Sequence, residues 1–219
     1  MHARPGHDHD PIPLRRPQAI LFDCDGTLLL TSGLHFKAIS GAIARLGHTM
    51  PPEWYMARTG LARHDLFARF AADFGVDPDL PRLVHDSVAL TVGLANEARE
   101  NPLVAELARK AAGRVPIAVV TNSEAAIAHA FLHATSLSPL FDCVLTCEDA
   151  PRPKPAPDLF LLAAARLGVA ARQCLVLEDS AQGLQAARAA GMACLDVRTD
   201  DWPAQCAGLL RALEPRAAQ

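Results

Sequence analysis

The sequence predicts an α/β protein whose core is a parallel sheet and which carries a small helical domain inserted after the first strand. Five short apolar runs, rich in Val, Ile and Leu, are bounded by polar or turn residues, a pattern typical of strands buried on both faces. Segments with helical periodicity separate the last four runs. The interval between the first two runs is far too long for a single crossover helix, so an additional unit must be inserted there.

The predicted strands follow one another along the chain as Gln18–Asp23, Pro116–Thr121, Asp142–Thr146, Gln173–Glu178 and Ala193–Val197. The helix after the second strand begins at Ser123, a favourable N-cap residue. The helix before the fourth strand has Pro157 in its first turn and Gly168 just past its end. The next helix has Ser180 as its N-cap and ends before Gly191. This alternation predicts a parallel sheet with right-handed crossovers.

The inserted interval contains three stretches with apolar residues at helical spacing, beginning near His35, Leu66 and Leu83. We therefore expect a helical domain over residues 33–98. The remaining segments, 18–32 and 99–219, would form the core domain. Two short connections would act as hinges between the domains, Leu30–Gly33 and Asn96–Pro102.

Composition and charge narrow the possible classes of protein. The 219 residues carry a formal net charge of -3, which provides no basic footprint for nucleic acid. No apolar run approaches the roughly 20 residues that cross a bilayer, and the N-terminus lacks a signal pattern, so we expect a cytoplasmic protein without a membrane partner. The six cysteines form no CxxC pair, which argues against a zinc site. A disordered tail over residues 1–17 and a monomer or weak homodimer are expected.

Two aspartates, Asp23 and Asp25, follow the first strand on either side of Cys24. Successive strand residues point to opposite faces, so the two carboxylates share one side and the cysteine faces the other. Such a pair must hold a cation, share a proton, or have its two pKa values pushed apart. An acidic turn without a chemical role is the alternative interpretation of this segment.

The other strand ends are polar as well, and ligands of open parallel sheets bind at this edge. The second strand runs into Thr121, Asn122 and Ser123, the third is followed by Lys154, and the fourth ends at Glu178-Asp179. The acids Asp23 and Asp179, with Glu178 nearby, offer hard oxygen ligands and favour Mg²⁺.

The donor groups at the same edge suit a phosphoryl group. They are Lys154, the Thr121 hydroxyl, and the backbone N–H groups of the Asp23 turn and of the helix start at Ser123. A cation and these donors would neutralise a charged substrate, so a carboxylate could attack phosphorus. A small phosphorylated metabolite is therefore the expected partner.

Four ordered motifs resemble those of the haloacid dehalogenase superfamily over residues 18–198: Asp23-Cys24-Asp25-Gly26-Thr27-Leu28, Thr121-Asn122, Lys154-Pro155-Ala156-Pro157-Asp158 and Glu178-Asp179-Ser180-Ala181-Gln182-Gly183. The chain is most similar to the branch with a helical cap after the first strand. That branch contains β-phosphoglucomutase, phosphoglycolate phosphatase and sugar-phosphate phosphatases. The resemblance implies a Rossmann-like core.

The resemblance also implies roles for single residues. Asp23 would be the nucleophile that forms an aspartyl-phosphate, and Asp25 would act as general acid and then as general base. Mg²⁺ would bind the Asp23 carboxylate, the backbone carbonyl of Asp25 and Asp179, with Glu178 close by. Thr121 and Lys154 would hold the phosphoryl oxygens, and Asn122 would lie on the substrate side.

In the cap, the segment Thr59–Asp65 resembles the loop that faces the active site, and Arg63 is the candidate for substrate specificity because its planar group suits phosphate or carboxylate. A solvated arginine at a helix start is the alternative. His35 lies where related enzymes often have a histidine near the hinge, and an ordinary first-turn residue is the alternative. Glu124 stands where mutases have a basic residue, and Leu80–Gly93 contains no lysine.

We therefore predict a Mg²⁺-dependent phosphatase of a sugar phosphate or a phosphoglycolate-like acid. The loss of basic groups argues against a β-phosphoglucomutase-type phosphomutase, which must bind both ends of a bisphosphate intermediate, but that alternative stays open. A phospho-acceptor module like a two-component receiver is a non-enzymatic rival. It fits less well, because such modules have no helical insert.

Overall fold

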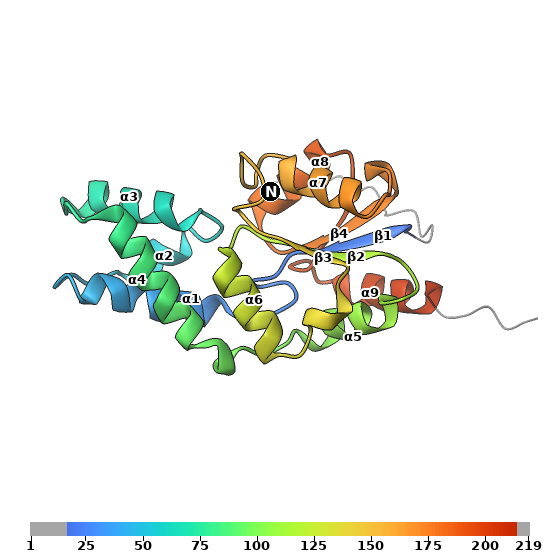
Figure 1. Cartoon of the computed structure of the whole chain (residues 1–219), viewed down its shortest axis with the longest axis horizontal. Helices are drawn as coiled ribbons and strands as arrows, with labels where there is room; N and C mark the ends of the chain where they lie inside the picture. The colour runs from blue at the N-terminus through green and yellow to red at the C-terminus, as the bar shows by residue number, and fades with distance from the viewer. Residues whose placement is uncertain (1–16, 214–219) are drawn as a thin grey trace, which may run out of the picture.

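The computed structural model describes residues 17–213 and contains one five-stranded parallel sheet with strand order β3-β2-β1-β4-β5 (Figure 1). The strands are Ala19–Phe22 (β1), Ile117–Val120 (β2), Cys143–Leu145 (β3), Cys174–Glu178 (β4) and Ala193–Asp196 (β5). All five coincide with the predicted runs, and the parallel α/β architecture is confirmed. The expected tail at residues 1–17 lies outside the described residues except for Pro17.

Helices occupy most of the remaining described chain. The α-helices are Ser32–Ala44 (α1), Pro52–Met56 (α2), Arg63–Phe74 (α3), Leu80–Gly93 (α4), Pro102–Ala111 (α5), Ala125–Ala134 (α6), Asp158–Arg166 (α7), Ala181–Ala189 (α8) and Trp202–Ala212 (α9). Short 3₁₀ turns lie at Ala95–Glu97, Ser138–Leu140 and Ala171–Gln173. The sequence pattern did not reveal α2, which has only five residues, or α9.

Helices cover both faces of the sheet, and alternate residues of β1 pack against different layers (Figure 1). Ile20 and Phe22 belong to the apolar cluster that includes α5, α6 and α9. Ala19 and Leu21 belong to the cluster that includes α7 and α8. This alternation follows from the two-residue period of a strand. Because both faces of β1 are buried in this way, its sequence is continuously apolar.

The outer strands β3 and β5 differ from the prediction of burial on both faces. Only Leu145 in β3 and Leu195 in β5 are buried, and the other residues of these strands are partly exposed. Each of these strands lies at an edge of the sheet and has a single neighbouring strand.

Helices α1 to α4 form a separate cluster beside the sheet layers, with α4 next to α6 (Figure 1). This cluster has its own buried apolar side chains, including Ile43, Phe67 and Phe70. The chain enters and leaves it through two segments that lie side by side. Leu30 N–H donates to Arg99 O at 2.7 Å, and Asn101 N–H donates to Leu28 O at 2.9 Å. No helix between residues 17 and 213 combines the length and the apolar character needed to span a bilayer.

Candidate active site

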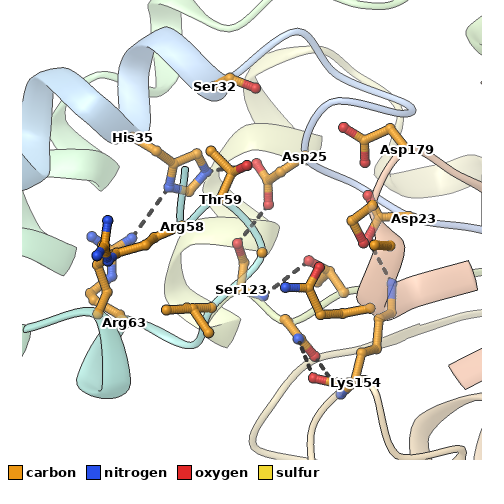
Figure 2. A pocket seen from close by; sticks show the side chains of 18 of the residues that line it. Asp23, Asp25, Ser32, His35, Arg58, Thr59, Arg63, Ser123, Lys154 and Asp179 are labelled. Carbon is orange, nitrogen blue, oxygen red and sulfur yellow. Dashed lines mark hydrogen bonds and ion pairs between the residues drawn. The ribbon is translucent and has the colours of Figure 1, made fainter. Parts of the chain in front are cut away.

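A cavity of about 390 Å³ lies at the carboxyl edge of the sheet, between the strand ends and helices α1 to α3. It is lined by residues at or after the ends of β1, β2, β3 and β4 (Figure 2). Side chains from the cluster of α1 to α4, here called the helical unit, complete the lining. All of the predicted site residues line it: Asp23, Asp25, His35, Arg63, Thr121, Asn122, Lys154, Glu178 and Asp179. The structure thus brings together groups that are up to 156 residues apart, Asp23 and Asp179.

Lys154 is buried at the floor of the cavity and makes three short hydrogen bonds. Its Nζ donates to Asp23 Oδ1 at 2.7 Å, to Glu178 Oε2 at 2.7 Å and to Val120 O at 2.8 Å. Burial alone would lower the pKa of Lys154, but the Asp23 and Glu178 carboxylates raise it above its usual value. The ammonium group therefore stays charged and donates a hydrogen bond to the Asp23 carboxylate.

Asn122 and Thr121, which follow β2, both make hydrogen bonds at this edge of the sheet, and Asn122 binds the loop that carries Lys154, here called the lysine loop. Asn122 Nδ2 donates to Lys154 O at 3.0 Å, and Lys154 N–H donates to Asn122 Oδ1 at 2.9 Å. The Asn122 side chain, predicted on the substrate side, is thus used to attach the lysine loop. Thr121, which is buried, accepts a hydrogen bond on Oγ1 from Ser123 N–H at 3.0 Å.

Glu178 uses both of its carboxylate oxygens within the protein. Oε1 accepts from Asp179 N–H, Ser180 N–H and Ser180 Oγ at 3.1, 3.0 and 2.8 Å, and Oε2 accepts from Lys154. The carboxylate lies against Gly183, where a Cβ atom would clash with it. Glu178 therefore joins the lysine to the start of α8, where Ser180 is the N-cap as predicted.

Three carboxylates form a compact acidic group at the cavity floor. Asp23, Glu178 and Asp179 each offer an oxygen within 4.8 Å of the others. Burial, with the neighbouring Glu178, raises the pKa of Asp23 well above its usual value and that of Asp179 to about 6. Burial is the larger cause of both shifts, and the repulsion between the carboxylates adds to it. Because the Glu178 oxygens are already engaged, Asp23 and Asp179 are the side chains that fit a hard cation such as Mg²⁺.

The turn after β1 is shaped to keep Asp179 close. Thr27 Oγ1 donates to Asp179 Oδ1 at 3.3 Å. Gly26 has a φ of +93°, and a Cβ atom there would clash with the Asp179 carboxylate. Only glycine combines this conformation with such a close approach.

Asp25 lies in a different hydrogen-bond environment from Asp23. Its Oδ1 accepts from Thr31 Oγ1 at 2.6 Å and lies 2.7 Å from His35 Nε2, and its Oδ2 accepts from Ser123 Oγ at 2.6 Å. Burial would raise the pKa of Asp25, but the attraction of His35 and these three hydrogen bonds outweigh it and hold the pKa below its usual value. The two aspartates thus have pKa values shifted in opposite directions, while Cys24 between them is in the core.

Ser123 does not cap α6, contrary to the sequence prediction. The helix begins at Ala125 with Glu124 as its N-cap residue. The Ser123 hydroxyl donates instead to Asp25, and its backbone N–H donates to Thr121 Oγ1. A charged acceptor forms a stronger hydrogen bond than a backbone group. The Ser123 N–H expected to face a phosphoryl group is therefore already used.

His35 and Arg63 continue this network into the helical unit. His35 Nδ1 lies 3.3 Å from an Arg63 guanidinium nitrogen, and the His35 ring packs edge-on against Phe131 at 5.7 Å. Arg63, the first residue of α3, is buried, with its Nε 3.1 Å from Glu124 Oε1 and another nitrogen 3.3 Å from Ser87 Oγ. Arg63 is therefore not the solvated arginine of the alternative interpretation. His35 lies near the start of α1, and its ring contacts Asp25.

Four residues of this network were not predicted as site residues from the sequence: Thr31, Ser87, Ser123 and Glu124. Thr31 falls in the predicted hinge Leu30–Gly33 and Ser123 is predicted as a helix cap, although both are hydroxyl residues close to motif positions. Ser87 carries no local signal. Glu124 is an acid where the mutases have a basic residue, but its partner Arg63 lies 61 residues away in sequence.

The family model described as haloacid dehalogenase-like hydrolase matches residues 17–191. Fructose-1-phosphate phosphatase YqaB of Escherichia coli (strain K12) is 37% identical over 184 residues, which are 84% of this chain and 97% of that protein. Hexitol phosphatase A of the same organism is 32% identical over 183 residues, 80% of this chain and 81% of that protein.

A solved structure shares the fold. It is a variant of CbbY from Rhodobacter sphaeroides in complex with xylulose-(1,5)bisphosphate. The superposition has a TM-score of 0.74 with 30% sequence identity and covers 81% of this chain and 84% of that chain.

Proposed function

The chain belongs to the haloacid dehalogenase-like hydrolase family, and from this premise we propose that it is a Mg²⁺-dependent phosphatase of small sugar phosphates that works through an aspartyl-phosphate on Asp23. Relatives that match over four fifths of the chain are named as phosphatases of a sugar phosphate and of hexitol phosphates. The observation that carries the proposal is the placement of Asp23, held by Lys154 at 2.7 Å, beside a second aspartate in a different hydrogen-bond environment.

In the first step, the Asp23 carboxylate attacks phosphorus and the bond between phosphorus and the ester oxygen breaks. Asp25 donates a proton to the departing oxygen. Lys154 and the Thr121 hydroxyl stabilise the charge on the phosphoryl oxygens. When bound by Asp23, Asp179 and the Asp25 carbonyl, Mg²⁺ supplies positive charge that lowers the repulsion between nucleophile and substrate.

In the second step, Asp25 takes a proton from water, which attacks the phosphorus of the aspartyl-phosphate and releases inorganic phosphate and free Asp23. The hydrogen bonds from Thr31 and Ser123 favour the ionised form of Asp25 that this step requires. A phosphoryl dianion beside Asp25 would raise its pKa when substrate binds, which supports the acid role in the first step.

We propose further that residues 33–98 act as a cap on the core made of 18–32 and 99–219. The cavity lies between these two parts. Gly60, in the loop before α3, lies so close to α8 that a Cβ atom there would be 2.7 Å from Gln182 Oε1. The cap thus contacts the core beside the cavity and would restrict access of water to it.

The phosphomutase alternative receives less support. A mutase must hold a second phosphate, and Arg63, the specificity candidate for an anion, is paired with Glu124 of the protein itself. Incubation with glucose 1-phosphate isomers separates the two activities. Accumulation of glucose 6-phosphate without release of phosphate would contradict a phosphatase.

The proposal is tested with p-nitrophenyl phosphate and Mg²⁺. We expect Asp23→Asn and Asp25→Asn each to lower phosphate release by at least about 10²-fold while the protein stays folded, because each removes one chemical group. The exposed Asp77, between α3 and α4, provides the control Asp77→Asn. Full activity of Asp23→Asn would exclude the covalent mechanism.

A further inference from the structure

Every arginine that lines the cavity is paired with a carboxylate of the protein, among the residues that the structure describes. The three pairs are Arg58 with Asp73 at 3.1 Å, Arg63 with Glu124 at 3.1 Å and Arg198 with Asp196 at 2.7 Å. The remaining cation, Lys154, is engaged at the phosphoryl end by Asp23 and Glu178. Each of these three guanidinium groups thus faces a carboxylate of the protein, although Arg58 shares Asp73 with Arg69.

The pair of Arg63 and Glu124 is the most buried of the three. Their side chains are 5% and 19% exposed, whereas the Arg198 side chain is 50% exposed. Charges that are shielded from water are screened little by salt. The pair also joins the helical unit to the segment after β2, since Arg63 begins α3 and Glu124 directly precedes α6.

Each part of the Arg63 guanidinium group has a partner within the protein. Nε faces both Glu124 oxygens at 3.1 and 3.3 Å, one terminal nitrogen faces Ser87 Oγ at 3.3 Å and the other faces His35 Nδ1 at 3.3 Å. An incoming phosphate or carboxylate would have to displace Glu124 and would be repelled by its charge.

The site is electrostatically divided along its length. In Figure 2, Arg58 and Arg63 lie together at one side, and Asp23, Asp179 and Lys154 lie at the opposite side, with Asp25 and Ser123 between them. Neutral polar side chains, including Ser32, Thr59 and Gln182, also line the cavity. Hydroxyl and amide groups of this kind pair with sugar hydroxyls.

We propose that Glu124, by neutralising Arg63, makes the cavity selective for phosphomonoesters whose remaining part is an uncharged polyol or sugar, and that it excludes sugar bisphosphates and phosphorylated carboxylic acids. This inference rests on the phosphatase function proposed above and narrows its substrate class. It assigns Glu124 as a specificity-determining residue. Arg63 then binds an internal carboxylate and not one of the substrate.

The test compares two substrates that differ by one phosphate, fructose 1-phosphate and fructose 1,6-bisphosphate. We expect the unmodified protein to prefer the monophosphate in kcat/KM by at least about tenfold. Glu124→Gln, which keeps the shape and removes the charge, should reduce that preference by about tenfold or more, mainly through a lower KM for the bisphosphate. Glu124→Asp should retain the preference.

Two control variants test whether the change in substrate preference comes from the pair of Arg63 and Glu124. Glu148, in the segment after β3, also contacts the start of α6: its Oε1 accepts from Ala125 N–H at 3.1 Å. It is not among the hydrogen-bond partners of Arg63, which are Glu124, Ser87 and His35. Glu148→Gln should leave the preference unchanged, and an equal effect of this change would overturn the role of Glu124. In Glu124→Gln combined with Arg63→Gln, the gain for the bisphosphate should disappear, because no freed guanidinium group remains.

Ligand binding to the Asp23→Asn variant measures the preference between the two sugar phosphates without requiring hydrolysis. Calorimetry should show tighter binding of fructose 1-phosphate than of the bisphosphate, and Glu124→Gln in this background should narrow the difference. Equal binding of both ligands, tighter binding of the bisphosphate, or binding of neither would overturn the inference. Absence of phosphate release by the unmodified protein from any monophosphate, with the binding preference intact, would instead reject the phosphatase.

Discussion

His35 Nε2 lies 2.7 Å from Asp25 Oδ1, so a residue of α1 contacts the second of the two aspartates that follow β1. The opposite ring nitrogen of His35 faces Arg63 at 3.3 Å, and Arg63 in turn contacts Glu124 at the start of α6. A continuous polar network therefore runs from the proposed acid and base to the contact between the helical unit and the core. Its members come from four separate stretches of sequence.

We expect His35→Gln to shift the pH dependence of activity. His35 lowers the pKa of Asp25, and burial would raise that pKa if this attraction were lost. Asp25 would then be protonated at higher pH, so the acidic limb of the kcat profile should move to higher pH and kcat should fall several-fold at the acidic end of the range. Steady-state rates with p-nitrophenyl phosphate across the pH range measure this effect. The exposed His48 provides the control His48→Gln, and an unchanged profile in His35→Gln would refute the prediction.

Replacement of Lys154 by methionine should affect stability as well as activity. The change leaves the carboxylates of Asp23 and Glu178 buried without their shared cation, and breaking such a pair typically costs about 3–5 kcal/mol in the free energy of unfolding. Urea titration at neutral pH measures the loss. For comparison, Lys110→Met removes an exposed ion pair with Glu106 and should change stability by no more than about 0.5 kcal/mol. Equal effects of the two changes would show that the Lys154 contacts are not stabilising.

Mg²⁺ should stabilise the protein more at neutral than at acidic pH. Burial and Glu178 raise the pKa of Asp179 to about 6 in the metal-free protein. Because this pKa is raised above the unfolded value, the stability it contributes is complete at low pH and is lost as the pH rises through about 6. A cation relieves the repulsion that appears there. The increase in Tm on adding Mg²⁺ should therefore be larger at about pH 7.5 than at about pH 5.

The Asp179→Asn variant serves as the control for the magnesium experiment. It removes one of the two side chains that fit the cation, so the Mg²⁺-dependent rise in Tm should be much smaller in it at both pH values. An increase in Tm that does not depend on pH in the unmodified protein would contradict the assignment of Asp179.

Gly26→Ala should weaken the proposed magnesium site. The φ of +93° at this position is strained for alanine, and the added Cβ would clash with the Asp179 carboxylate. We expect a loss of at least about 1–2 kcal/mol in stability and about tenfold weaker binding of Mg²⁺. Denaturant titration and calorimetry measure the two effects. Gly93→Ala is the matched control, because a Cβ there meets no atom within 4 Å. Unaltered magnesium binding in Gly26→Ala would show that the close approach is not needed.

The strands, the parallel arrangement and the gathering of the motif residues were predictable from the sequence. Runs such as Ala19–Phe22 are continuously apolar because helices cover both faces, and polar residues directly after such runs must lie at one sheet edge. Ser180 and Gly191 mark the ends of α8 through local hydrogen bonding and backbone conformation. Signals of this kind depend on neighbours in sequence, so they can be recognised without the tertiary structure.

The partners of the polar side chains depended on packing between distant segments. Ser123 looked like a helix cap, but the approach of Asp25 gives its hydroxyl a charged acceptor. Glu124 and Arg63 are 61 residues apart and meet only because α3 lies against the start of α6. By itself the sequence determined which chemical groups share the sheet edge, because strand periodicity and chain order set their positions. The tertiary structure decided which charges neutralise one another, because the energy of a charge pair depends on distance and burial, and neither is encoded locally.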